Sequence, residues 1–398
     1  MTYNHLNHIQ EVFDIFVSKN EVAGLNLLIY QNDKEIGYWQ AGYKNIEKKQ
    51  TFDRDTICRL YSMSKPITSV AALMLVEQGK LDLGSPVGNY LPAFWNTKVC
   101  TEPGKNGKPV KAQRTILIQD LLNMTSGYTY GAYWEGATLG EHMTSEYIQV
   151  LNQDCIKDCK ISTQEVANHF SEIPLSFEPG TDYNYGFSAD ILGAVIEVVS
   201  GQKLSEFLKK NIFEPLEMKD TAFYVPQEKQ CRLSNVYKCV NNKLELFTSP
   251  NLGIQPFMDH APSFESGGAG LCSTIDDYMK FASMLCNKGV YNGVRILQEK
   301  TVDFISKGKL SPLLQQKFNQ KMEHLLGYSY SNLMRIAQEP GYCKAITEKG
   351  EFGWDGWLGP YMSVDLKNNL TIVMLMQKTD AGTWELTRRV KNIIYTSL

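Results

Sequence analysis

The stretch Leu60-Tyr61-Ser62-Met63-Ser64-Lys65-Pro66-Ile67-Thr68 determines how the rest of the chain is interpreted. It places Ser62 three residues before Lys65, directly ahead of the strongly apolar run at residues 66–78. Proline is tolerated in the first turn of a helix, so Pro66 predicts that a helix begins here. Residues three apart share a helix face, which lets the Ser62 hydroxyl meet the Lys65 amine. A lysine amine that is buried, or close to another positive charge, has a lowered pKa and can act as a base.

The S-x-x-K pattern occurs three times, and its surroundings separate the copies. Ser200–Lys203 contains Gly201, which is typical of a helix end, and Ser306–Lys309 lies in a lysine-rich segment that we expect to be solvated. Only Ser62 precedes a strongly apolar helix, where the positive helix end would help an oxyanion to form. From these local features alone, a serine that caps the helix beside an exposed lysine remains an alternative.

Composition and charge exclude several function classes. The chain has 398 residues and a formal net charge of -3, without a basic block, which argues against nucleic acid or an anionic membrane as partner. Nine cysteines leave at least one thiol unpaired, and the closest pair, Cys155 and Cys159, lacks the companions of a zinc site. The N-terminus does not resemble a signal peptide, and no apolar run approaches the ~18 residues of a membrane span. We therefore expect a cytoplasmic protein.

Hydrophobic periodicity predicts strands at both ends of the chain and helices between them. The predicted helices cover residues 8–19, 66–78, 117–123, 163–171, 188–199, 203–211, 274–287 and 383–395. The predicted strands cover residues 24–30, 35–41, 326–333, 360–365 and 370–377. Residues 95–115 are polar and predict a surface excursion.

Two hairpin strands are marginally stable alone, so the N-terminal pair most simply joins the C-terminal strands in one antiparallel sheet. This predicts an α/β (α+β) fold whose sheet is flanked by helices and built from both chain ends. Residues 1–80 and 300–398 would form this discontinuous domain, and residues 81–299 a mainly helical insert. We expect the active site at their interface.

Several common catalytic and phosphate-binding motifs are absent. The chain contains no G-x-S-x-G elbow, H-E-x-x-H pair, Walker loop or Rossmann glycine fingerprint. The glycine-rich run at residues 267–270 lacks the strand and helix of a phosphate loop, so we interpret it as a tight backbone turn.

The segment at residues 60–68 resembles the nucleophile segment of serine β-lactamase-like hydrolases, the superfamily of class C β-lactamases, DD-peptidases and related esterases. The similarity continues at residues 77–83 ("EQGKLDL"), at residues 120–127 ("DLLxHTSG", with Met124 where the family often has His) and at residues 267–274 ("GGxGLxST"). With two further motifs, the resemblance spans residues 60 to 365. It implies Ser62 as nucleophile and Lys65 as its partner.

The second family motif, Y-x-N or Y-S-x, is best matched at residues 179–193, where Pro179-Gly180-Thr181 leads to Tyr185 and then to Ile191-Leu192-Gly193. The resemblance makes Tyr185 the catalytic tyrosine. Gly186 and Phe187 stand where the family often has Ser and Asn, so an amide that contacts substrate is missing. Tyr183, two residues earlier, could be confused with Tyr185, although an aromatic wall is the preferred interpretation. Tyr183 and Phe187 are candidate substrate-binding residues.

The third family motif is K-T-G, H-x-G or W-G-G, and the matching triplet is Trp354-Asp355-Gly356. The lysine of this motif usually helps to bind a substrate carboxylate, which Trp354 cannot do, and Asp355 adds negative charge. All three are predicted to bind substrate, although sheet packing would also explain Trp354 and Trp357. The resemblance places the oxyanion between the backbone N–H groups of Ser62 and Trp357.

These residues predict a serine hydrolase that forms an acyl-enzyme at Ser62, with Lys65 and Tyr185 sharing the general-base work. The favoured substrate is a small uncharged ester or amide, and no metal or organic cofactor is expected. An acyltransferase, a β-lactamase or D-amino-acid peptidase, and a non-turnover acyl-binding protein remain alternatives. The order of proton transfer, the physiological substrate and the oligomeric state stay open.

Overall fold

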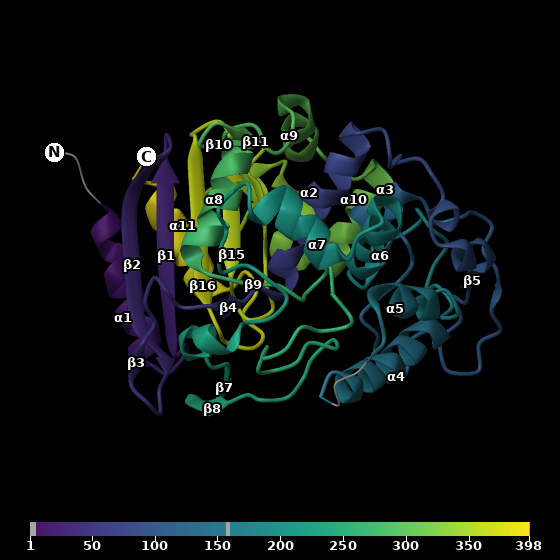
Figure 1. The fold of residues 1–398 in the computed structure, drawn as a ribbon, viewed down its shortest axis with the longest axis horizontal. Coiled ribbons are helices and arrows are strands. Elements are labelled where there is room, and N and C mark those ends of the chain that lie inside the picture. Colours follow the sequence, from purple (N-terminus) through teal and green to yellow (C-terminus); the bar gives the residue numbers. More distant parts are fainter. Residues whose placement is uncertain (1–4, 157–159, 398) are drawn as a thin grey trace.

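The computed structural model describes residues 5–156 and 160–397. Its centre is an eight-stranded antiparallel sheet in the order β12-β13-β14-β15-β16-β1-β2-β3 (Figure 1). These strands are β1 Gly24–Gln31, β2 Lys34–Asn45, β3 Gln50–Thr51, β12 Tyr328–Ser331, β13 Met334–Ala337, β14 Phe352–Asp355, β15 Tyr361–Asp365 and β16 Leu370–Met376. Short two-stranded pairs lie outside it: β4 Cys58–Arg59 with β9 Cys272–Ser273, β5 Lys98–Val99 with β6 Val110–Lys111, β7 Tyr237–Val240 with β8 Lys243–Leu246, and β10 Val290–Tyr291 with β11 Val294–Arg295.

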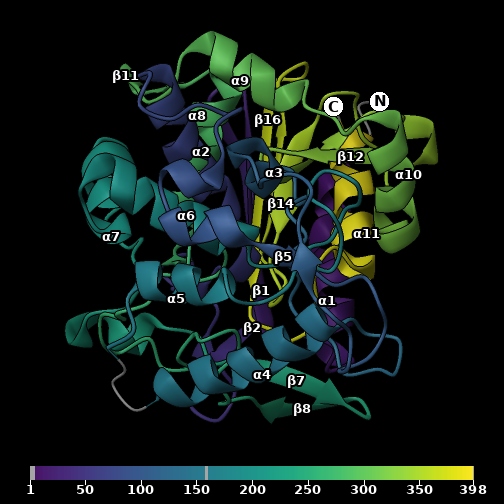
Figure 2. The same ribbon diagram turned by 90° about the vertical axis from the view of Figure 1, so that its right-hand side faces the viewer.

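The helices surround this sheet and extend well beyond one end of it (Figures 1 and 2). They are α1 His8–Ser18, α2 Ser64–Glu77, α3 Ile118–Leu122, α4 Leu139–Asp154, α5 Thr163–Phe170, α6 Ser188–Ser200, α7 Leu204–Leu208, α8 Ile275–Cys286, α9 Glu299–Ser306, α10 Pro312–Lys321 and α11 Glu385–Tyr395. The predicted fold class, an antiparallel sheet flanked by helices and built from both chain ends, is confirmed.

The joint between the two chain ends lies in the middle of the sheet. Strand β1 pairs antiparallel with β16 from Leu25 opposite Met376 to Gln31 opposite Leu370. Successive side chains of a strand point to opposite faces, and β1 is apolar on both. Leu27 packs with α1 and α11 on one face, whereas Leu28 joins the large core on the other. The hairpin is thus stabilised by partners more than 300 residues away in sequence.

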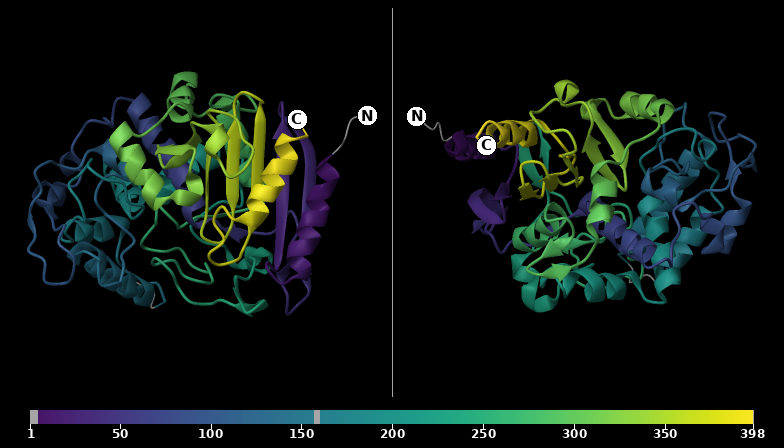
Figure 3. Two further views of the ribbon diagram at one scale, coloured as in Figure 1. Left: turned by 180° about the vertical axis from the view of Figure 1, so that it is seen from behind. Right: turned by 90° about the horizontal axis from the view of Figure 1, so that it is seen from above.

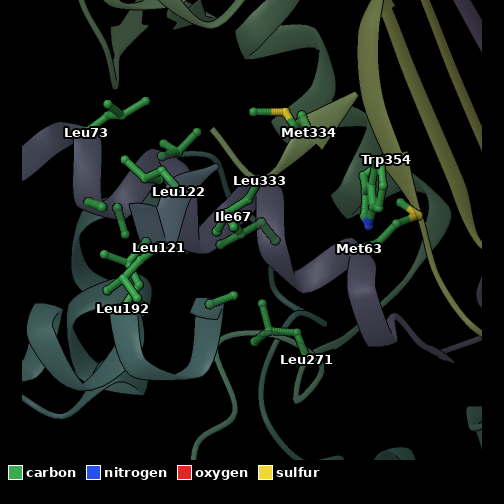
Figure 4. Packing of buried hydrophobic residues seen from close by; sticks show 14 of the residues in the cluster. Met63, Ile67, Leu73, Leu121, Leu122, Leu192, Leu271, Leu333, Met334 and Trp354 are labelled. Atoms are coloured by element: carbon green, nitrogen blue, oxygen red, sulfur yellow. The ribbon is translucent and has the colours of Figure 1, made fainter. Parts of the chain in front are cut away.

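The two faces of the sheet are covered differently. Helices α1 and α11 cover the outer face, as the view from behind shows (Figure 3). Helix α8 packs on β16 on the inner face, and α2 is buried along nearly its whole length in the core beyond (Figure 4). The domain boundary predicted at residue 300 would assign α8 to the helical insert, although α8 packs against the sheet. That boundary stays a prediction.

Three helices were not predicted: α4, α9 and α10. Helix α4 has a weakly apolar sequence, and its signal is the capping box in which the Thr138 hydroxyl accepts from Glu141 N–H and the Glu141 carboxylate accepts from Thr138 N–H. The S/T-x-x-E pattern at residues 138–141 is the sequence signal for this helix start.

Seven of the described cysteines are free thiols: Cys58, Cys100, Cys231, Cys239, Cys272, Cys286 and Cys343. Cys159 of the predicted closest pair lies outside the described residues. Within residues 5–156 and 160–397, no helix combines the length and the apolar character that crossing a membrane requires.

A buried ion cluster connects α11 to the sheet. The Glu351 carboxylate, 0% exposed, lies 3.2 Å from Arg335 Nη2 and 2.9 Å from Lys391 Nζ. Burial alone would raise the pKa of Glu351, but the two cations outweigh it and lower the pKa to about 2. Because the folded-state pKa is below the unfolded value, the stabilisation is present above the unfolded pKa and is lost as pH falls toward 2.

We predict that Glu351→Gln destabilises the protein by about 3–5 kcal/mol, because it leaves two buried cations without their counter-charge. The matched control is Glu348→Gln, which removes a carboxylate from a surface ion pair with Lys367 and should cost less than about 1 kcal/mol. Urea unfolding of both variants measures the difference. Equal unfolding midpoints for the two variants would contradict a stabilising role of the cluster.

Candidate active site

The site is built around the start of helix α2. Ser62 lies in the short 3-10 turn Tyr61–Met63, immediately before the helix, and is 9% exposed. Lys65, in the first helical turn, is 0% exposed, and its Nζ lies 3.1 Å from Ser62 Oγ. The sequence alternative of an exposed lysine beside a capping serine does not fit this burial.

The surroundings of Lys65 favour loss of its proton. Its Nζ donates to Ser62 Oγ, to Tyr130 Oη at 2.9 Å and to the Gly268 carbonyl at 2.9 Å. Burial lowers the pKa of Lys65 to about 7, although the negative charges of Asp190 and Asp355 act in the opposite direction. A substantial fraction of the amine is therefore neutral near pH 7, which is the form that can accept a proton.

Tyr185 lies just before α6 and reaches the same point. Its hydroxyl accepts from Trp354 Nε1 at 2.8 Å, and its ring centroid is 4.6 Å from Lys65 Nζ. Burial raises the pKa of Tyr185 well above its usual value. The Ser62 side chain is near enough to act on the phenol and opposes the rise of its pKa. The structure thus brings together Ser62, Lys65 and Tyr185, and the phenol keeps its proton at neutral pH.

Tyr130 is a functional candidate that the sequence argument did not assign. It belongs to an aromatic-rich stretch, residues 128–134, which matches no family motif. In the structure its hydroxyl accepts from Lys65, and its ring lies 5.5 Å from that of Tyr185 and 4.9 Å from that of Phe187. No local pattern marks Tyr130, because its partner is 65 residues away.

Gly186 allows the loop that carries Tyr130 to approach the site closely. A Cβ atom at Gly186 would lie 2.5 Å from Thr129 Cα and 2.7 Å from Tyr128 O, closer than real Cβ atoms approach. The loop before Tyr130 therefore passes over Gly186, which stands where the family often has Ser. The departure from the family pattern was the available sequence signal for this close approach.

The glycine-rich run at residues 267–270 forms a turn against α2 and α6. A Cβ atom at Gly268 would lie 2.6 Å from Asp190 Oδ2, and the carbonyl of the same glycine accepts from Lys65. The interpretation as a tight backbone turn fits this packing, and the turn supplies one of the three acceptors of the Lys65 amine.

A cavity of about 550 Å³ opens in front of these residues. It is lined by Tyr61, Ser62, Tyr130, Gly131, Ala132, Tyr133, Ser145, Ile148, Gln149, Tyr185, Asn251, Leu252, Met322, His324, Trp354, Asp355, Gly356, Trp357 and Gly382. The cavity lining includes the three residues of the third motif that are predicted to bind substrate, Trp354, Asp355 and Gly356. It also includes Ser62 and Trp357, predicted to form the oxyanion hole.

Tyr183 and Phe187, the other predicted substrate-binding residues, are not part of this lining. They are 0% and 1% exposed. The ring of Tyr183 packs on Phe318 and Tyr330, and Phe187 supports the ring of Tyr130 from behind. Their burial places them in the hydrophobic core next to the cavity, so their predicted contact with substrate stays a prediction.

The backbone of the third motif lies directly against the nucleophile turn. A Cβ atom at Gly356 would overlap the carbonyl oxygen of Leu60, so only glycine lets these chains touch. The ring of Trp357 packs edge-on against Tyr61 at 5.0 Å, and its Nε1 donates to Asp380 at 2.7 Å. Tyr61, immediately before Ser62, has φ of 46°, a strained value for a side chain of this size.

His324 is a second residue that sequence reasoning missed. It lies in no family motif, yet it lines the cavity on the segment after α10. Burial lowers its pKa, and the opposing influence of Asp355 is smaller. The imidazole is therefore neutral at pH 7 and can donate or accept a hydrogen bond.

The known proteins to which this chain is similar include an esterase and an acyltransferase. The chain is 25% identical over 400 residues to esterase EstB of Burkholderia gladioli, which covers 97% of this chain and 94% of that protein. It is 27% identical to the monacolin J acid methylbutanoyltransferase of Aspergillus terreus, over 86% and 82% of the two chains. The structure of EstCE1, described as a hydrolase with promiscuous acyltransferase activity, superposes with a TM-score of 0.80 at 22% identity and 98% coverage of both chains.

The match to a family model extends from residue 9 to residue 393 and so includes both chain ends of the sheet as well as the Ser62 turn. The resemblance inferred from the motifs is thereby confirmed over nearly the whole chain. The protein belongs to the Beta-lactamase family.

Proposed function

We propose that this protein is a serine hydrolase that forms an acyl-enzyme at Ser62, acting as an esterase or amidase on a small substrate with an uncharged acyl group. One observation carries the proposal: the buried Lys65 amine, with a pKa of about 7, lies 3.1 Å from the Ser62 hydroxyl oxygen. A base within hydrogen-bond reach of its nucleophile, and poised near neutral pH, is what acyl transfer requires.

In the first step, neutral Lys65 accepts the proton of Ser62 as Oγ attacks the substrate carbonyl carbon. The negative charge moves to the carbonyl oxygen, which the N–H groups of Ser62 and Trp357 would bind. Tyr185, whose raised pKa keeps it protonated, is suited to relay a proton to the leaving alcohol or amine. The carbonyl re-forms, the bond to the leaving group breaks, and the acyl group stays on Ser62.

In the second step, water attacks the acyl carbon, and its proton passes through Tyr185 to Lys65. The carbonyl then re-forms, the bond between the acyl carbon and Ser62 Oγ breaks, and the Lys65 ammonium returns the proton to Oγ, which releases the acid and restores both residues. Tyr130 accepts a hydrogen bond from the Lys65 amine and thereby orients it. None of these steps requires a metal or an organic cofactor. The seven free thiols support the further proposal of a reducing, cytoplasmic compartment.

Acyl transfer to an alcohol is a second candidate. The cavity of about 550 Å³ has room for an acceptor beside an acyl group, and relatives of this chain include a methylbutanoyltransferase as well as an esterase. Product ratios with and without an alcohol acceptor distinguish the two activities. β-Lactam hydrolysis is less favoured, because Trp354 replaces the lysine that would hold a substrate carboxylate.

We predict that Ser62→Ala abolishes hydrolysis of p-nitrophenyl butyrate, because no other hydroxyl can form the acyl-enzyme. Ser306→Ala, which changes the serine of another S-x-x-K copy at the end of α9, is the matched control and should retain the native rate. Intact-mass spectrometry should detect a butyryl adduct on the native protein and none on Ser62→Ala. Parental turnover by purified Ser62→Ala would refute the assignment.

The pH dependence follows from Lys65. Because its pKa is lowered to about 7, the competent neutral amine becomes more abundant as pH rises through that value. We therefore expect kcat/KM to rise with pH, with an apparent pKa near 7, and then to level off. A stopped-assay profile with an uncharged ester, whose own ionisation does not interfere, measures this. A flat profile from pH 5 to pH 9 would contradict a titrating base.

Tyr130→Phe tests the residue that the sequence did not reveal. We expect kcat to fall by about 10-fold or more and the apparent pKa of the pH profile to move downward, because the Lys65 ammonium loses an acceptor. Tyr128→Phe is the matched control, since its buried hydroxyl has no hydrogen-bond partner among the described residues. A pH profile that stays in place in Tyr130→Phe would show that the hydroxyl does not act on Lys65.

A further inference from the structure

The cavity lining carries little formal charge, and what it carries is negative. Among the residues that line it, no Lys or Arg is present, and Lys65 lies buried behind the lining. His324 has a lowered pKa and is neutral at pH 7. Among the described residues that line the cavity, Asp355 alone carries a formal charge, and that charge is negative.

Asp355 forms no ion pair within residues 5–156 and 160–397, although the buried Arg335 is close enough for an electrostatic interaction. The Asp355 carboxylate accepts a hydrogen bond from the Thr383 hydroxyl. Arg388, the guanidinium on the adjoining helix α11, donates instead to the Thr383 carbonyl at 3.3 Å and does not line the cavity. The negative charge therefore acts into the cavity, where it influences both Lys65 and His324.

Aromatic rings form much of the remaining wall. The aromatic residues that line the cavity are Tyr61, Tyr130, Tyr133, Tyr185, Trp354 and Trp357. Trp357 follows Asp355 by two residues and is fixed by its contacts with Tyr61, Phe247 and Asp380. Tyr133 is 62% exposed at the rim. The faces of aromatic rings attract cations, most strongly those of Trp and Tyr.

We propose that this cavity binds an ammonium group, so that the preferred substrate is an ester or amide with an uncharged reacting carbonyl and a positively charged nitrogen elsewhere in the molecule. This inference rests on the proposed function and changes its substrate class. The reacting carbonyl stays uncharged, but a positive charge in the leaving group or in the acyl group replaces the uncharged substrate expected above. Asp355 supplies the counter-charge, and the aromatic wall replaces the hydration shell of the cation. A substrate carboxylate would meet the same negative charge and be repelled.

The first test compares esters that differ only in charge. Butyrylcholine is paired with 3,3-dimethylbutyl butyrate, in which carbon replaces the charged nitrogen. In the second pair the charge lies on the acyl side. Methyl 4-(trimethylammonio)butanoate is compared with methyl 5,5-dimethylhexanoate, its uncharged analogue. We expect kcat/KM to favour the charged ester by about tenfold in at least one pair, and less so as salt is added.

Asp355→Asn should reduce this preference to within about threefold of unity. Because the preference is a ratio measured in one preparation, a general loss of active enzyme cancels. Asp14→Asn, which makes the same change of net charge on α1 at the outer face of the sheet, is the matched control and should retain the native ratio. No preference in either pair, or a preference that survives in Asp355→Asn, would overturn the inference.

A binding experiment separates this inference from the proposed function. Calorimetry with the Ser62→Ala protein compares choline with 3,3-dimethylbutan-1-ol, its uncharged isostere, so no turnover is needed. We expect choline to bind about tenfold more tightly, and the difference to disappear when Asp355→Asn is added. Equal binding of the two alcohols overturns the ammonium site even if esters are hydrolysed. Tighter choline binding without ester hydrolysis supports the site and counts against the proposed function alone.

Discussion

The burial of one amine is the constraint on which the site depends. Lys65 has no access to solvent, so its charged form loses hydration and its pKa falls to about 7. Helix α2, which carries it, is buried along nearly its whole length, and the turn at Gly268 closes over the amine with a carbonyl acceptor. The large core is therefore part of the chemistry, because a more hydrated Lys65 would stay protonated beside Ser62.

The third motif affects the balance of charges that sets the pKa of Lys65. Trp354 carries no charge that could lower the pKa of Lys65, and its indole instead donates to Tyr185 and holds that phenol in place. Asp190 and Asp355 both favour the protonated lysine. Desolvation must outweigh these two carboxylates, which explains why Lys65 is enclosed on every side by Ser62, Tyr130 and the Gly268 turn instead of being open to the cavity.

The sequence predicted those features that local patterns carry. Strand alternation and the marginal stability of an isolated hairpin were sufficient to predict a sheet made from both chain ends, and S-x-x-K before an apolar helix identified Ser62 and Lys65. Features that depend on distant contacts were not predicted. Tyr130 reaches Lys65 from 65 residues away, and His324 enters the cavity from a segment without a motif. Helix α8 packs on the sheet for a similar reason, because its partner β16 lies nearly 90 residues further along the chain.

The same long-range geometry connects the charge of Asp355 with the Lys65 amine. Asp355 raises the pKa of Lys65 across the cavity. An ammonium group bound beside Asp355 would offset that negative charge and place a positive charge nearer to Lys65, and both effects favour the neutral amine. The base would then become more competent when the cavity is filled by a substrate of the proposed class than when it holds water. Removal of Asp355 would lower the Lys65 pKa in the empty enzyme while weakening the binding of the cation, so its effects on the pH profile and on KM would have separate physical origins.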